Sequence, residues 1–117
     1  MIPRKRVLAR ITLVAAIVFA VVMALEPKPL VVVEVWDKWQ HMAAFAVLAA
    51  LATWAYPEAE PLRLGERLSL LGALIEVAQA SPLVHRDCDI RDWVADTIAA
   101  ALVLLLVSLY RRRRAAT

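Results

Sequence analysis

Cysteine and glycine are nearly absent from this chain of 117 residues, and each absence excludes a class of site. Cys88 is the single cysteine, so one chain contains no disulfide and no metal site built on several thiolates. The two glycines, Gly65 and Gly72, are too few for a glycine-rich phosphate-binding loop, and no nucleophile elbow is present. The common nucleotide-binding and α/β-hydrolase motifs are therefore excluded.

Apolar residues, in contrast, make up 62% of the sequence. An average soluble domain has roughly 45–50%. The excess is clustered in four stretches near the roughly 20 residues that a helix needs to cross a bilayer. We expect spans at about residues 7–25, 37–56, 62–83 and 92–110, the third being the weakest because Glu76 and Gln79 interrupt it. The sequence thus predicts a single all-α domain over residues 1–117. The expected fold is an integral membrane four-helix bundle, with the lipid bilayer as a partner.

The first stretch has a second interpretation. Basic residues followed by a short apolar run are also typical of a secretory signal peptide, and Val22-Met23-Ala24 is a weak cleavage site. We favour a retained helix, because the later stretches are also membrane-like. The segment 30–36 is too short to span and is expected to be an interfacial segment or an extended lead-in to the second helix.

Basic residues concentrate at the two ends of the chain. Arg4, Lys5, Arg6 and Arg10 open it and the run 111–114 nearly closes it, which accounts for 8 of the 14 basic residues. Such ends are typical of cytoplasmic membrane-flanking anchors, so both termini are predicted to be cytoplasmic and the number of spans even. This interpretation also removes the need for nucleic acid as a partner. Four tryptophans lie near the expected helix ends, as in an aromatic belt: Trp36, Trp39, Trp54 and Trp93.

Polar residues inside the apolar stretches gather at the outer end of the expected bundle. A charged residue at the centre of a membrane-spanning helix costs roughly 2.5–3.5 kcal/mol of insertion free energy, so such residues usually have a pairing or functional role. Several of these residues form pairs three or four positions apart, and the two members of such a pair share one helix face. The pairs are Asp37 with His41, Glu76 with Gln79, and Asp92 with Asp96. The candidate binding site consists of Asp37, Lys38, His41, Glu76, Gln79, Arg86, Asp92 and Asp96.

Individual roles follow from the chemistry of these side chains. His41 and Glu76 are the candidates for proton transfer, and the planar guanidinium of Arg86 suits a phosphate or carboxylate. Each also has a structural interpretation, as an interhelical hydrogen bond or an ion pair with a neighbouring aspartate. His41, Glu76 and Asp92 match no specific metal motif, and neither a metal nor a cofactor is predicted.

These residues also form a pattern in sequence order. Asp37-Lys38-Trp39-Gln40-His41 resembles the DKxxH element of the VanZ-like family, and Glu76-Val77-Ala78-Gln79 with Arg86 and Asp92 resembles its ExxQ…R…D element. The resemblance covers about residues 35–105. The family often has Asn where Asp96 stands and Gly where Ala99 stands.

The resemblance implies a small multi-pass protein of the bacterial inner membrane with a cell-envelope role. The founding member of the family is associated with low-level resistance to the glycopeptide teicoplanin. Three functions stay open. In the first, the polar residues bind a lipid-linked envelope precursor or an envelope enzyme. In the second, they are the active site of a membrane enzyme that acts on a lipid-linked headgroup, with His41 or Glu76 as acid or base. In the third, they only hold the helices together.

Overall fold

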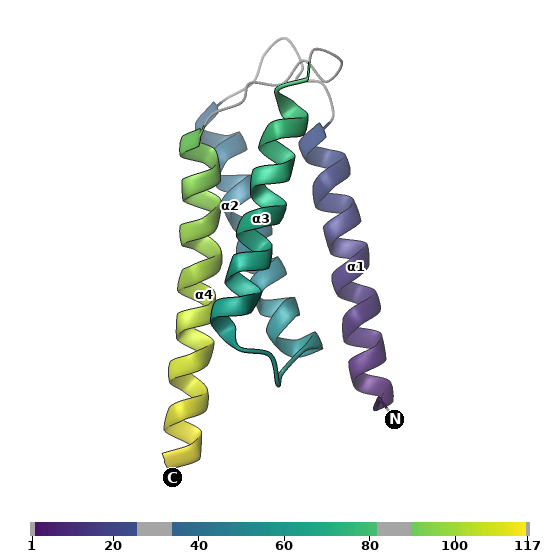
Figure 1. Cartoon of the computed structure of the whole chain (residues 1–117), viewed down its shortest axis with the longest axis vertical. Coiled ribbons are helices and arrows are strands. Elements are labelled where there is room, and N and C mark those ends of the chain that lie inside the picture. The colour runs from purple at the N-terminus through teal and green to yellow at the C-terminus, as the bar shows by residue number, and fades with distance from the viewer. Residues whose placement is uncertain (1, 26–33, 82–89, 117) are drawn as a thin grey trace.

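The computed structural model describes residues 2–25, 34–81 and 90–116, and these form four α-helices, with a short turn between the second and the third. The helices are α1 (Arg4–Leu25), α2 (Glu34–Ala55), α3 (Pro61–Gln79) and α4 (Ile90–Ala116). They alternate in direction, so both chain ends and the α2–α3 turn lie at one end of the bundle (Figure 1). We call this the terminal end and the opposite one the distal end. The expected all-helical class with four helices is confirmed.

The start of α2 and the ends of α3 and α4 differ from the expected spans. α2 begins at Glu34, so the last part of the 30–36 segment is helical, whereas 30–33 lies outside the described residues. α3 ends at Gln79 rather than near residue 83, because Ser81 precedes Pro82 and a proline restricts the residue before it to extended conformations. α4 continues through its arginine run to Ala116.

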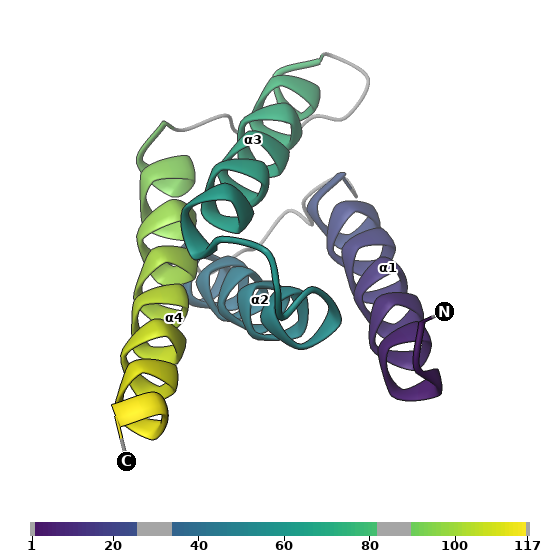
Figure 2. The same ribbon diagram turned by 60° about the horizontal axis from the view of Figure 1, so that its bottom comes forward.

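α2 is the centre of the bundle. Among the described residues it packs against all three other helices, most extensively against α4, whereas α1 does not touch α4. Figure 2 shows α2 between these two helices. Six of the thirteen buried apolar residues of the described part are alanines, and such small residues let the helix backbones approach closely. The buried small residues are Ala9, Ala24, Ala49, Ala52, Ala55, Gly72 and Ala100, and Leu48 is the largest fully buried side chain of the described part.

Large apolar side chains cover the outer surface instead. On α1 they recur at Val7, Ile11, Val14, Val18 and Val22, a spacing that places them on one helix face. α3 and α4 carry corresponding outward stripes, formed by Leu70, Leu74 and Val77 and by Val94, Ile98, Leu102 and Leu106. Monomeric soluble proteins rarely expose contiguous apolar patches larger than a few hundred Å². α1 and α4 are long and apolar enough to cross a membrane, whereas α2 and α3 fall short of that criterion when each is taken alone.

Candidate functional site

The described candidate residues all belong to helix turns at the distal end. His41 lies two turns into α2, Glu76 and Gln79 lie in the last turn of α3, and Asp92 and Asp96 lie in the first two turns of α4. These three helix ends share the distal end because consecutive helices run in opposite directions (Figure 1). Arg86 lies outside the described residues, and Asp37 and Lys38 are described only as part of the α2 backbone.

Burial divides these residues into two groups. His41, Glu76 and Asp92 are half-buried, so each keeps part of its side chain accessible. Gln79 is buried, and Asp96 is only 5% exposed. A carboxylic acid at that depth is costly unless it is paired or hydrogen-bonded. Asp96 therefore belongs to the interior of the bundle, whereas His41, Glu76 and Asp92 each keep accessible surface.

Gln79 connects two helices that otherwise touch little. Its side-chain Nε2 donates a hydrogen bond to the carbonyl oxygen of Ala24 at 2.8 Å. Ala24 is one residue from the end of α1, where carbonyl groups have no partner within the helix. The side chain expected beside Glu76 in the binding site therefore also attaches the end of α1 to α3.

Trp93 fixes α4 against α3 one turn from Asp96. Its indole Nε1 donates to the carbonyl oxygen of Ser69 at 2.9 Å, and the Ser69 and Thr97 hydroxyls are 3.1 Å apart. A methyl group on Gly72 would meet the Trp93 ring at 3.2 Å, so the glycine makes room for the indole. The sequence placed Trp93 in an aromatic belt and gave no sign of this contact beyond the isolated glycine.

The described residues contain no group of three or more His, Cys, Asp or Glu side chains arranged to hold a metal ion. His41, Glu76 and Asp92 therefore form no such group with one another. Their chemistry is that of hydrogen-bonding and charged groups at the rim of a helix bundle. The two carboxylates suit a ligand with hydroxyl, amide or cationic groups, because carboxylates accept hydrogen bonds and repel anions.

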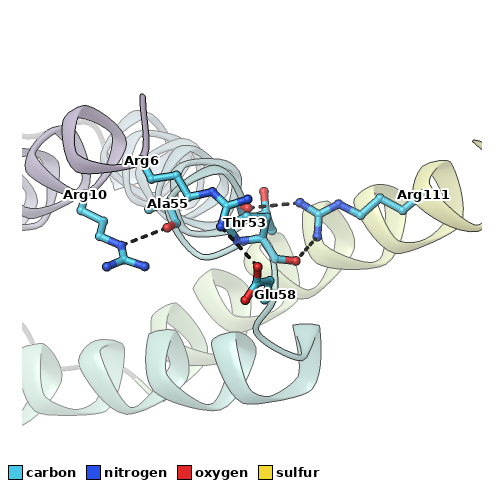
Figure 3. Close-up of polar contacts among 7 residues, drawn as sticks. Arg6, Arg10, Thr53, Ala55, Glu58 and Arg111 are labelled. Atoms are coloured by element: carbon cyan, nitrogen blue, oxygen red, sulfur yellow. Dashed lines mark hydrogen bonds and ion pairs between the residues drawn. The ribbon is translucent and has the colours of Figure 1, made fainter. Parts of the chain in front are cut away.

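The terminal end holds a second polar arrangement, in which arginines from α1 and α4 meet the last turn of α2 (Figure 3). Arg10 Nε donates to the Ala55 carbonyl at 3.2 Å, and its guanidinium lies 4.3 Å from the centre of the Tyr56 ring. Arg111 donates to the carbonyls of Thr53 and Pro57 at 3.1 and 3.2 Å. Cations are favourable at a helix C-terminus, where carbonyls lack partners. The arginines expected to be membrane-flanking anchors thus also cap α2.

Arg6 adds an exposed contact at the same end. Its guanidinium lies 3.5 Å from Glu58 of the α2–α3 turn. Exposed ion pairs of this kind contribute roughly 0–1 kcal/mol. The capping of α2 therefore depends mainly on Arg10 and Arg111.

Arg111→Ala is expected to lower the free energy of unfolding by about 1–2 kcal/mol, because two charged hydrogen bonds to carbonyls at the α2 C-terminus are lost. Arg112→Ala is the matched control, since Arg112 is exposed and carries the same charge on the next residue of α4. We expect the control to stay within about 0.5 kcal/mol of the parent. Equal unfolding curves for the two variants would contradict the capping role.

The fold and its surface define a class, an all-α four-helix protein with two helices apolar enough to cross a membrane. No protein-family model, curated protein or solved structure matches the chain.

Proposed function

We propose that this chain is an integral membrane protein in which all four helices lie in the bilayer. The observation that carries the proposal is the distribution of side-chain size. Alanines account for six of the thirteen buried apolar residues of the described chain, and large apolar side chains also face outward on every helix. In lipid, helices associate through close packing of small residues rather than by hiding apolar surface. Exposed Val47 on α2 and Leu74 on α3 extend this pattern to the two less apolar helices.

Charge supports one orientation of the bundle. Cytoplasmic segments of membrane proteins are enriched in Lys and Arg. Ten of the 14 basic residues belong to the terminal end, namely Arg4, Lys5, Arg6, Arg10, Arg63, Arg67, Arg111, Arg112, Arg113 and Arg114. Three acidic residues, Glu58, Glu60 and Glu66, accompany them. We therefore assign both termini to the cytoplasm and the distal end to the outer face of a bacterial inner membrane.

The distal end then presents His41, Glu76 and Asp92 to the outer surface, half-buried at the rim of the bundle. This supports a binding or accessory role in the cell envelope, in which the site recognises the polar headgroup of a lipid-linked wall precursor or modulates an envelope enzyme. Arg86, close in sequence to Asp92, would hold an anionic group of the ligand. The VanZ-like resemblance points to the same setting and to glycopeptide resistance as a phenotype.

A purely structural role is the second candidate, and two contacts favour it. Gln79 joins α3 to α1, and Trp93 joins α4 to α3. On this interpretation the distal polar residues hold the helices together and take no part in binding. It predicts that substitutions at the distal end lower folded yield and do not change whatever ligand binding the remaining folded protein shows.

One experiment separates the two candidates. The double variant Glu76→Gln/Asp92→Asn keeps the shape of both side chains and removes their charge. We expect it to weaken retention of a labelled lipid-linked wall precursor by the purified protein at least about tenfold, because charged hydrogen bonds contribute roughly 1.5–3 kcal/mol each. Its melting temperature should stay within a few degrees of the parent. The control Gln79→Leu should behave in the opposite way, with lower stability and less change in retention per folded molecule.

Unchanged retention and unchanged glycopeptide susceptibility in the double variant would remove the binding proposal. Loss of folded yield alone would favour the structural role. Turnover of the precursor by the parent, absent in His41→Ala, would convert the proposal into an enzyme with His41 or Glu76 as acid or base.

A further inference from the structure

The outer face of α1 contains a shallow apolar hollow with a single charged residue on its wall. The hollow has a volume of about 540 Å³ and is lined by Ile2, Val7, Arg10, Ile11, Val14 and Ala15. It opens to the outside of the bundle. Its apolar lining residues are therefore available to a ligand rather than to another helix of the described chain.

Arg10 brings unused hydrogen-bonding capacity to this wall. Its Nε is engaged with Ala55, and its face lies over Tyr56. Within the described part of the chain, its two terminal nitrogens donate no hydrogen bond, whereas Figure 3 shows the bond from Nε to Ala55. The stacked ring and the bonded Nε hold the guanidinium in place, so these nitrogens are presented in a fixed orientation.

The charged side chains of α1 beside the hollow are all basic. Arg4 and Lys5 are exposed in the first turn of α1, and α1 contains no acidic residue. Arg6, the remaining basic residue of this helix, lies against Glu58. The potential beside the hollow is therefore positive, and it attracts an anion rather than a zwitterion.

We propose that this hollow binds an anionic phospholipid, with its phosphate on the terminal nitrogens of Arg10 and an acyl chain along Ile11, Val14 and Ala15. An arginine fork matches phosphate geometry, and the apolar wall suits a hydrocarbon chain. The proposal rests on the membrane placement proposed above. It assigns a ligand to the cytoplasmic leaflet, separate from the ligand of the distal site.

Native mass spectrometry of the purified full-length protein in neutral detergent tests this site. The protein is titrated with phosphatidylglycerol, with phosphatidylcholine and with inorganic phosphate. We expect phosphatidylglycerol to bind about tenfold more tightly than phosphatidylcholine, and Arg10→Gln to remove most of that difference. Arg112→Gln, which removes the same charge from an exposed position at the same end, should leave the affinity for phosphatidylglycerol within about twofold.

A second variant keeps the test independent of the contact between Arg10 and α2. Val14→Trp fills the hollow from an exposed position and leaves Arg10 intact. It should weaken phosphatidylglycerol binding and leave inorganic phosphate binding unchanged. Equal affinity for the two lipids, insensitivity to both variants, or equal binding of phosphate alone would overturn the lipid site. A protein that purifies folded without detergent would overturn the membrane placement itself, which is a different and distinguishable failure.

Discussion

Leu70→Lys is expected to remove most of the folded protein from the membrane fraction. Leu70 lies at the middle of α3 and is 59% exposed, on the face that we assign to lipid. A lysine at the centre of a membrane helix costs roughly 2.5–3.5 kcal/mol on insertion scales. In water the same substitution on an exposed face would change stability by only about 0.5 kcal/mol. The variant therefore distinguishes a membrane bundle from a soluble one by a large margin.

The matched control makes the same chemical change at the terminal end. Leu62→Lys places lysine on the first turn of the same helix, at a position that is 72% exposed. Its side chain extends to the interface, so the expected cost is small. The amount of each variant that remains in the membrane fraction is measured by alkaline extraction of membranes followed by quantification of the protein. Equal recovery of the two variants in the membrane, or a folded soluble Leu70→Lys protein, would contradict the proposed placement of α3.

Leu48→Ala is expected to lower the free energy of unfolding by about 3 kcal/mol. Leu48 is 1% exposed and lies on α2, the helix that contacts the three others. Its removal leaves a cavity at the centre of the bundle, and Leu→Ala changes in packed interiors cost roughly 2.7–5 kcal/mol. The neighbouring alanines are too small to fill the space.

Val47→Ala provides the control for this second prediction. Val47 precedes Leu48 in α2 but is 55% exposed, so its truncation creates no cavity. We expect a change within about 0.5 kcal/mol, measured for both variants by denaturant titration of the purified protein. If Val47→Ala destabilised as much as Leu48→Ala, the orientation of α2 in the bundle would be wrong.

The number of helices and the end to which each belongs could be predicted from the sequence. The four apolar stretches and the proline-containing breaks at 27–29 and 57–61 separate the expected helices, and an alternating path follows from their order. The same reasoning placed His41, Glu76 and Asp92 at one end. The expected ends differ from the structure in α3, where the effect of Pro82 on the preceding residues outweighed the apolar composition, and in α4, which continues through its arginine run.

The rotation of each helix and the choice of its neighbours could not be predicted in this way. Apolar residues cover most faces of α1 and α4, so the sequence shows no distinct buried stripe. Contacts such as Gln79 with Ala24 and Arg111 with Thr53 depend on these rotations and join residues more than 50 positions apart. The small residues were the available signal, because Gly72 lies where Trp93 packs.

Labelling with a membrane-impermeant maleimide tests the central claim most directly, namely that the distal end faces outward and the terminal end faces the cytoplasm. Cys88, the only thiol, lies between α3 and α4 in the sequence, and a Cys88→Ser/Glu60→Cys variant moves the thiol to the α2–α3 turn. We expect native Cys88 to react in intact cells and the variant to react only after permeabilisation. The reverse pattern would invert the topology and place the candidate site in the cytoplasm. Labelling of both in intact cells would contradict a four-span bundle.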